Sequence, residues 1–410
     1  MSLRTVAARA ASRGPLAEAG RRLALEVARR IRIGQLTVLL PDGTRQVVGT
    51  PGGPEGELHI HDTAAAWRMI LNGEMGAGEG YMDGHWSSPD LPALLRLAAL
   101  NRETLALNRW IQLPLRLPQL AAHRARRNTL RQSRANIRAH YDLGNEFYRL
   151  FLDESLTYSS AVFATPEQSL ADAQRNKYRI IAERAGLVPG MHVLEIGSGW
   201  GGFALYAAGE LDCRVTTITI SKAQHELATR RVGEAGLADR VSVELRDYRE
   251  VAGRYDAIVS IEMLEAVGAE FFGTFFAACD RALGMGGKVS LQTITLPDVG
   301  YEPQRRGVNW IQAYIFPGGL VPSLAAIERS LHGTRLLITG TQDIASSYVR
   351  TLATWRANLL AQREQVMALG LDERFLRMWE YYLAQSEAGF ATGLIQDQQI
   401  VLEKRRGLAA

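Results

Sequence analysis

The chain has 410 residues, of which 47% are hydrophobic, and a formal net charge of +4 at pH 7. This length predicts two or three domains, and the sequence excludes a transmembrane protein, because no apolar run approaches the roughly 20 residues of a membrane span. The two cysteines, Cys213 and Cys279, have neither redox nor metal-ligand spacing, which predicts packed thiols in a reducing compartment. The arginine-rich N-terminus lacks the apolar core of a signal peptide. We therefore expect a cytoplasmic protein.

The first hundred residues predict a small module. Residues 1–35 have the pattern of an arginine-rich helix, and 35–62 contain two alternating runs typical of strands. His59 and His61 alternate on the second run, and without a third ligand we expect a surface pair and no metal site. The elements expected next are a helix, a loop and a short helix, over residues 63–72, 78–86 and 91–100.

A basic segment follows, because no acidic residue occurs between Glu103 and Asp142. It interleaves apolar residues with eight arginines: Arg109, Arg116, Arg124, Arg126, Arg127, Arg131, Arg134 and Arg138. Such a pattern suits contact with lipid phosphates beside apolar burial. A solvated helical face or an inter-domain linker fits equally well, and nucleic acid would suit the charge.

From about residue 135 onward, expected strands alternate with helices. The strands are expected at 191–197, 214–220, 241–245, 255–261 and 287–294. This βαβ periodicity predicts an α/β fold with a mostly parallel sheet. Long amphipathic helices are expected over 351–391.

The first of these strands runs into a glycine-rich turn, VLEIGSGWGG, over Val193–Gly202. Gly197, Gly199 and Gly201 allow the backbone to turn tightly and to approach a ligand closely. In a doubly wound sheet, this turn lies at the carboxyl end of a strand, where nucleotides bind. By itself the pattern is also compatible with an ordinary strand–helix turn or an NAD site.

The positions of the acidic residues separate these alternatives. An NAD site places a carboxylate at the end of the second strand, but that strand ends in Thr219-Ile220-Ser221. The acid is instead Glu195, inside the glycine motif, and Asp247-Tyr248 follow the third strand. This arrangement resembles the S-adenosylmethionine (SAM) site of class I methyltransferases. Asp247 could alternatively be a helix N-cap.

The residues at the end of the fourth expected strand indicate which kind of group accepts the methyl. Methyltransferases that modify amino groups of nucleic acids carry an Asn/Asp-Pro-Pro-aromatic corner here, but this chain reads SIEMLE over 260–265. Neither cysteine is a candidate nucleophile for pyrimidine methylation. The common nucleic-acid chemistries are therefore disfavoured, and no nucleic-acid partner is expected.

Six ordered motifs make a family resemblance specific. Together they resemble the cyclopropane-fatty-acyl-phospholipid synthase family, which includes mycolic-acid cyclopropane synthases and lipid-methylating relatives: Asn136–Tyr148, Leu156–Phe163, Val193–Gly202, Thr219–Gln224, Glu262–Gly268 and Tyr314–Ser323. The resemblance implies a Rossmann-like class I methyltransferase domain over 135–410. A basic amphipathic linker over 106–134 and a small α+β, lipid-facing N-terminal domain over 1–105 would precede it.

The resemblance also implies the reaction. A cis double bond of a phospholipid acyl chain attacks the methyl group of SAM, and the resulting carbocation loses a proton from that methyl group to a bound bicarbonate, closing a cyclopropane ring. Because an alkene is a poor nucleophile, catalysis would depend on alignment and stabilisation of positive charge. If the base were displaced, the cation could lose a neighbouring proton and leave a methyl-branched chain.

Site residues follow from the resemblance, position by position. Glu265 would anchor bicarbonate, with backbone from Ile294 and a hydroxyl from Tyr348. Ser160 and Gln292 stand where many members have cysteine and histidine, and both can still donate hydrogen bonds. Tyr141, in the His140–Asp142 motif, would line the mouth of the site. The cofactor-binding set comprises Tyr158, Ser159, Glu195, Gly197, Gly199, Gly201, Thr219, Ser221, Gln224, Asp247 and Tyr248.

The expected partners are unsaturated phospholipids, reached by peripheral association with the inner face of the membrane, and the resemblance leaves a homodimer open. Three alternatives remain: a methyltransferase producing branched chains, an RNA methyltransferase and an inactive lipid-binding protein. The missing proline corner opposes the second. The intact glycine turn and Glu265 oppose the third.

Overall fold

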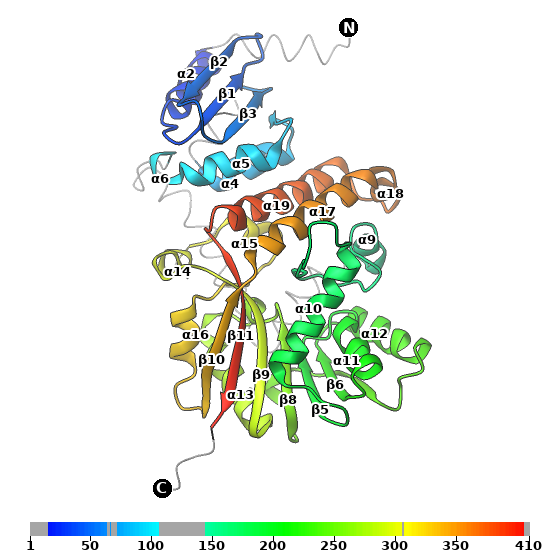
Figure 1. Ribbon diagram of the computed structural model, residues 1–410. Helices are drawn as coiled ribbons and strands as arrows, with labels where there is room; N and C mark the ends of the chain where they lie inside the picture. Colours follow the sequence, from blue (N-terminus) through cyan, green and yellow to red (C-terminus); the bar gives the residue numbers. More distant parts are fainter. Residues whose placement is uncertain (1–14, 64–65, 67–71, 106–143, 306, 406–410) are drawn as a thin grey trace. The chain divides into compact units, whose positions relative to one another are not determined.

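The computed structural model describes residues 15–63, 66, 72–105, 144–305 and 307–405 (Figure 1). Contacts between Cα atoms divide the chain into two compact units. The smaller unit comprises the described part of Met1–Ala122 together with Val308–Ile315 and Leu359–Leu394, and the larger unit comprises the rest. Two segments that the sequence interpretation placed in the catalytic domain therefore lie in the smaller unit. The domain boundaries expected from the sequence stay a prediction.

The smaller unit combines one four-stranded sheet with helices from both ends of the chain. The strand order is β2-β1-β3-β4, in which β1 pairs parallel with β3 and the other pairs are antiparallel. The strands are β1 (Gln35–Leu39), β2 (Arg45–Gly49), β3 (Glu55–Ile60) and β4 (Trp86–Ser87). The helices are α2 (Pro15–Ala28), α4 (Glu74–Met82), α5 (Leu91–Leu100), α6 (Arg102–Leu105), α15 (Trp310–Tyr314), α18 (Arg363–Ala368) and α19 (Glu373–Ala391). The long helix α19 packs against α4 and α5.

Most of the sequence-based elements in this unit are confirmed, with additions. The two alternating runs form β1 and β3, and the short helix is α5. Strand β2 was not predicted. The helix expected over 63–72 lies largely outside the described residues. His59 Nε2 lies 2.5 Å from Glu57 Oε1, and His61 Nε2 lies 2.7 Å from Ser87 Oγ.

The prediction of a loop over Gly78–Trp86 is wrong, because most of this segment belongs to helix α4 and Trp86 begins β4. Its glycines lower helix propensity, but they are buried and let neighbouring side chains approach the helix backbone. A Cβ atom placed on Gly78 would lie only 2.3 Å from the indole nitrogen of Trp310. Tertiary packing therefore overrides the local preference of this sequence.

We expect Gly78→Ala to destabilise the protein by about 1–3 kcal/mol, because the added methyl group overpacks a buried contact. A matched control is Gly233→Ala, at an exposed helical glycine where an added Cβ meets nothing within 4 Å. That change should stabilise the helix by up to about 1 kcal/mol. Urea unfolding of the full chain measures both. Equal midpoints for the two variants would contradict the packing argument.

The larger unit is a seven-stranded sheet in the order β10-β11-β9-β8-β5-β6-β7. Strands β5 to β9 pair in parallel, and β11 is antiparallel to both of its neighbours. The strands are β5 (His192–Ile196), β6 (Arg214–Thr219), β7 (Val241–Leu245), β8 (Tyr255–Ile261), β9 (Leu283–Thr295), β10 (Leu336–Asp343) and β11 (Gln396–Lys404). The five expected strands and the mostly parallel sheet are thus confirmed, and the pair β10–β11 is new.

Helices cover both faces of this sheet (Figure 1). They are α9 (Asn145–Arg149), α10 (Leu170–Ala185), α11 (Gly202–Glu210), α12 (Lys222–Glu234), α13 (Phe272–Ala282), α14 (Asp298–Arg305), α16 (Leu324–Ser330) and α17 (Ala345–Ala361), with 3₁₀ turns η1 (Tyr248–Glu250), η2 (Leu264–Ala266) and η3 (Ala269–Phe271). The long helices expected over 351–391 are confirmed as α17 to α19. No described helix is both long and apolar enough to cross a bilayer.

Two apolar clusters form the core of the larger unit. One packs α13 and α16 against the sheet through residues such as Phe275 and Ile327, and the other packs α10 and α11 through Ile181 and Phe203. Strands buried on both faces explain the nearly continuous apolar runs in the sequence. Both cysteines are buried and free, as expected. The order of the strands reverses between β5 and β8, and sheets of this kind bind ligands at the carboxyl ends of the strands beside this point.

Candidate active site

The glycine turn follows β5 and has the backbone that the sequence predicts. Gly197, Gly199 and Gly201 have φ values of 99°, 48° and 89°, a region that favours glycine. The amides of Gly197 and Ser198 both donate to the carbonyl of Ile218 on β6, at 3.0 and 2.9 Å. A Cβ atom on Gly199 would meet nothing within 4 Å. The turn is therefore held to the neighbouring strand and leaves open space into which a cofactor could fit.

Glu195 lies just before this turn and is almost fully buried. Its Oε2 accepts a hydrogen bond from Thr217 Oγ1 on β6 at 2.5 Å. Burial raises the pKa of Glu195 to about 8, only partly opposed by this bond and by Lys177. The carboxyl is thus largely protonated at neutral pH unless a bound cation lowers its pKa.

The expected residues after β6 fix the start of α12. Thr219 Oγ1 donates to Gln224 Oε1 at 2.8 Å. Ser221 is the N-cap of α12, and its hydroxyl accepts from the amide of Gln224. These three side chains position the loop that follows β6. Their contact with a cofactor stays a prediction.

Asp247 caps the 3₁₀ turn η1, as the alternative interpretation proposed. It accepts from the backbone amide of Arg249 at 3.0 Å and from its guanidinium at 2.8 and 2.7 Å. Tyr248 packs against Phe275, with ring centroids 5.5 Å apart, and burial raises its pKa to about 12. Asp247 is thus committed to an ion pair within its own loop.

Tyr158 and Ser159 lie in the segment before α10. The Tyr158 ring packs among aromatic side chains, including Tyr148 at 5.4 Å and Trp355 at 5.3 Å between centroids. Ser159 Oγ accepts from the buried ammonium of Lys177 at 2.7 Å. Aromatic faces of this kind can stabilise a positive charge.

Glu265 lies on η2, directly after β8, and holds the end of β9. Its Oε1 accepts from the backbone amide of Ile294 and from Thr293 Oγ1, the latter at 2.9 Å. Its Oε2 has no hydrogen-bond partner among the described residues. Burial and the nearby charge of Glu262 raise the pKa of Glu265 to about 8. The free oxygen can therefore carry a proton at neutral pH and donate it to a ligand.

Glu262 is bound by the donors that the sequence interpretation assigned to an anion. Its Oε2 accepts from Tyr348 Oη at 2.7 Å. Its Oε1 accepts from the backbone amide of Ser160 at 2.7 Å and from Gln292 Nε2 at 2.8 Å. The Ser160 hydroxyl points elsewhere and donates to the carbonyl of Ala161. These donors therefore do not fit a separate bicarbonate ion, because a carboxylate of the chain occupies them.

A second layer of buried polar groups surrounds Glu262. Asp397 Oδ2 accepts from Gln292 Nε2 at 3.2 Å, and Gln399 Nε2 donates to Gln292 Oε1 at 3.1 Å. Burial and the neighbouring glutamates raise the pKa of Asp397 well above its ordinary range. Burial lowers the pKa of Lys177 to about 8, an effect opposed by Glu262 and other carboxylates.

Glu262, Lys177 and Asp397 were not among the site residues predicted from the sequence. Glu262 stands in the same EMLEAVG motif as Glu265 and also follows β8 directly, so its position was a usable signal. Lys177 lies within a helix and Asp397 within an unpredicted strand, and neither belongs to a recognisable motif. Tyr141 and its neighbours lie outside the described residues, as does most of the basic segment.

The loop that follows β5 and the loop that follows β8 lie against each other. A Cβ atom on Gly197 would lie 3.0 Å from Met263 Cγ, so the residue between Glu262 and Leu264 touches the glycine turn. The structure thus places Glu262 and Glu265 in the loop that adjoins the open glycine turn. Such a site can bind a cationic cofactor, stabilise developing positive charge and accept a proton.

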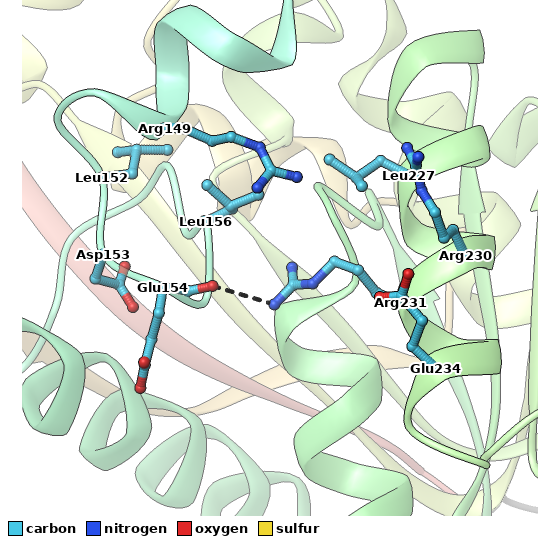
Figure 2. Close-up of a pocket in the computed structure, with 9 residues that line it drawn as sticks. All are labelled: Arg149, Leu152, Asp153, Glu154, Leu156, Leu227, Arg230, Arg231 and Glu234. Carbon is cyan, nitrogen blue, oxygen red and sulfur yellow. Dashed lines mark hydrogen bonds between the residues drawn. The ribbon is translucent and has the colours of Figure 1, made fainter.

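An open pocket of about 560 Å³ lies near α9 and α12 (Figure 2). It contains none of the expected site residues, and its charges balance: Arg149, Arg230 and Arg231 against Asp153, Glu154 and Glu234. Arg231 is committed to backbone carbonyls, including those of Ser155 at 2.9 Å and Trp200 at 2.7 Å. The pocket therefore has no clear preference for an anion.

Comparisons with known proteins agree with this geometry. A family model described as mycolic acid cyclopropane synthetase matches residues 128–400. Tuberculostearic acid methyltransferase UfaA1 of Mycobacterium tuberculosis is 40% identical over 403 residues, covering 95% of this chain and 93% of that protein. Cyclopropane-fatty-acyl-phospholipid synthase of Escherichia coli K12 is 33% identical over 367 residues, covering 88% and 91%. The structure of mycolic acid cyclopropane synthase CmaA1 with SAH and CTAB is 32% identical, with a TM-score of 0.62, covering 66% of this chain and 98% of that one.

Proposed function

This chain belongs to the mycolic acid cyclopropane synthetase family, and we propose that it adds one carbon from SAM to the cis double bond of an unsaturated phospholipid acyl chain. One observation carries this proposal: two acidic residues, Glu262 and Glu265, follow β8 beside a glycine turn that has open space at Gly199. SAM, when bound, supplies an electrophilic methyl group. The backbone at Gly199 would hold its methionine part, and the buried acid Glu195 would face its positive charge.

The chain's own residues would then handle the acyl chain. The aromatic side chain of Tyr158, which packs on the fully buried rings of Tyr148 and Trp355, would present an apolar surface to the alkene. Its ring face would also stabilise a carbocation. The carboxylate of Glu262, which accepts hydrogen bonds from Tyr348, Gln292 and the amide of Ser160, would stabilise the same charge electrostatically. Because bicarbonate does not fit the donors around Glu262, the proposed chemistry does not depend on that ion.

Two products are candidates. Ring closure to a cyclopropane is the product that the sequence motifs imply, and it is the activity in the name of the Escherichia coli relative. A methyl-branched chain is the second candidate, because the relative that matches 95% of this chain is named a methyltransferase. Both candidates begin with the same methyl transfer. They differ in which proton the resulting carbocation loses.

Lipid mass spectrometry tests this function, on cells that express the chain and grow with methyl-deuterated methionine. A gain of one carbon that retains two deuterons, with proton NMR signals of a cyclopropane, identifies the ring-forming enzyme. Retention of three deuterons in a branched chain identifies the methyltransferase. An unchanged lipid profile, with the purified protein inactive on unsaturated phospholipid vesicles, would refute both.

We further propose peripheral binding to anionic membrane surfaces through the basic segment, at the inner face of the membrane. Salt screens such contacts, since the Debye length falls from about 10 Å at 0.1 M to about 3 Å at 1 M. Sedimentation with phosphatidylglycerol vesicles should therefore fall severalfold between those salt concentrations. Arg124→Gln/Arg126→Gln/Arg127→Gln should weaken binding at low salt. Binding that is independent of salt would contradict the proposal.

A further inference from the structure

The carboxylate of Glu262 occupies the place expected for a bound anion. We propose that Glu262 is the catalytic base of this enzyme, and that it takes the proton from the transferred methyl group without any bicarbonate. This inference rests on the proposed methyl transfer to an alkene. It concerns the same site and names a residue that the sequence motifs did not assign.

The hydrogen-bond geometry is the first argument. Three separate parts of the larger unit converge on Glu262: Tyr348 from α17, Gln292 from β9 and the backbone amide of Ser160. A carboxylate and a bicarbonate present the same planar pair of acceptor oxygens, so one set of donors holds one or the other. Here the anion is covalently part of the chain. Its effective concentration at the site does not depend on solution bicarbonate.

The backbone is the second argument. Glu262 has a φ of 47°, in the left-handed region that a non-glycine residue rarely adopts. Its amide donates to the carbonyl of Gln292 at 2.8 Å, which fixes this turn against β9. Such strain persists where surrounding contacts enforce it, and it is common at active sites. The turn holds the carboxylate against its donors.

Exposure and charge are the third argument. Asp397 and Lys177 are fully buried and Oε2 of Glu265 is also buried, whereas Glu262 is a half-buried residue, so it is the acid of this cluster that a substrate can approach. The charged or titratable groups that face Glu262 are Tyr348, Lys177, Asp397 and Glu265. Burial raises the pKa of the three carboxyl groups, those of Glu262, Glu265 and Asp397. Glu262 has three hydrogen-bond donors, so it is the acid best able to keep its negative charge.

The step balances as follows. The alkene π electrons form a bond to the methyl carbon, the carbon–sulfur bond breaks, and a cation remains on the acyl chain. Glu262 accepts one proton from the added methyl group. The electron pair of that C–H bond closes the ring. If a hydride has first shifted from the methylated carbon to the cationic carbon, the same electron pair instead forms a methylidene branch. No oxidant or other reactant is required.

The test uses the full-length protein, SAM and vesicles of cis-unsaturated phosphatidylglycerol in carbon-dioxide-free buffer, with and without added bicarbonate. The wild-type rate should be the same in both buffers. Glu262→Gln, which keeps the shape but cannot accept the proton, should lose about 100-fold or more of the rate, as expected for removal of a general base. Glu328→Gln, at an exposed glutamate of α16 in the same unit, is the matched control and should keep the wild-type rate.

Glu262→Gly makes the test sharper. Glycine accepts the left-handed backbone and vacates the three donors, so added bicarbonate should restore at least about tenfold of the lost rate. SAM binding by calorimetry should be unchanged in both variants, which separates lost base chemistry from misfolding. A bicarbonate requirement in the wild type, a lipid product that keeps all three deuterons of the transferred methyl group, or a Glu262→Gln variant that keeps its rate would overturn the inference. If the wild type forms no lipid product at all, the proposed function fails instead.

Discussion

Between pH 5 and pH 8, the free energy of unfolding of the protein without its cofactor should fall by several kcal/mol. Glu195 and Glu265 have pKa values raised from 4.5 to about 8 in the folded chain. Between pH 4.5 and about pH 8 the folded state keeps protons that the unfolded state has lost, so the free energy of unfolding decreases as pH rises. Each retained proton contributes about 1.4 kcal/mol per pH unit. Glu195 and the free oxygen of Glu265 are both buried, so both groups should contribute to the effect.

The decrease should stop near pH 8. There the two glutamates ionise in the folded state, and Lys177, whose pKa is lowered from 10.5 to about 8, releases its proton. Above this pH the unfolded state holds the lysine proton more tightly, so this group makes stability rise with pH. Urea unfolding at half-unit intervals of pH measures the profile. The double variant Glu195→Gln/Glu265→Gln should make the profile less steep, with Glu262 and Asp397, whose pKa values are also raised, retaining part of the slope. An equally steep profile in that variant would assign the whole effect to other groups.

Replacing Glu265 by alanine should reduce the rate of lipid methylation by about 100- to 10,000-fold, the range for a positioned acid or electrostatic group. At neutral pH its raised pKa keeps a proton on the acid, and Oε2 is the oxygen left without a described partner. Glu265→Gln should retain more activity, since an amide reproduces the donor and acceptor of the neutral acid.

Transfer of labelled methyl groups from SAM into extracted lipid measures both Glu265 variants. Glu328→Gln again serves as the control, because its side chain is exposed. If alanine and glutamine were equally harmful, the ionised form would be the active one. An alanine variant with the wild-type rate would remove Glu265 from the catalytic machinery.

The parallel part of the fold could be predicted because its strands are apolar runs between glycines and helices. Strand β11 was missed for a physical reason: its first half reads Gln396-Asp397-Gln398-Gln399, which has neither alternation nor an apolar run. Those polar side chains are buried because Asp397 and Gln399 hydrogen-bond Gln292. The polar network of the site thus removes the hydrophobic signal of a central strand.

The site could be predicted in part. Motif resemblance identified Glu265, Gln292 and Tyr348, and the structure places all three in or beside one network, with Tyr348 and Gln292 bonded to Glu262. Glu262 could not be identified in the same way, because the resemblance implied that the anion at this site is bicarbonate taken up from solution. Asp247 shows the opposite case: the sequence offered both a cofactor contact and an N-cap, and the structure has the N-cap, with an ion pair to Arg249 that no sequence pattern indicated.

The position of the last fifty residues has a consequence for biosynthesis. Helix α19 completes the smaller unit by packing on α4 and α5, and β11 lies between β10 and β9 in the larger sheet. At about 5–20 residues per second, α19 leaves the ribosome roughly a quarter of a minute to a minute after α5. Both nascent units must wait for the end of translation before their hydrophobic surfaces close. A ribosome that stops short of β11 would release a chain whose larger sheet lacks an interior strand.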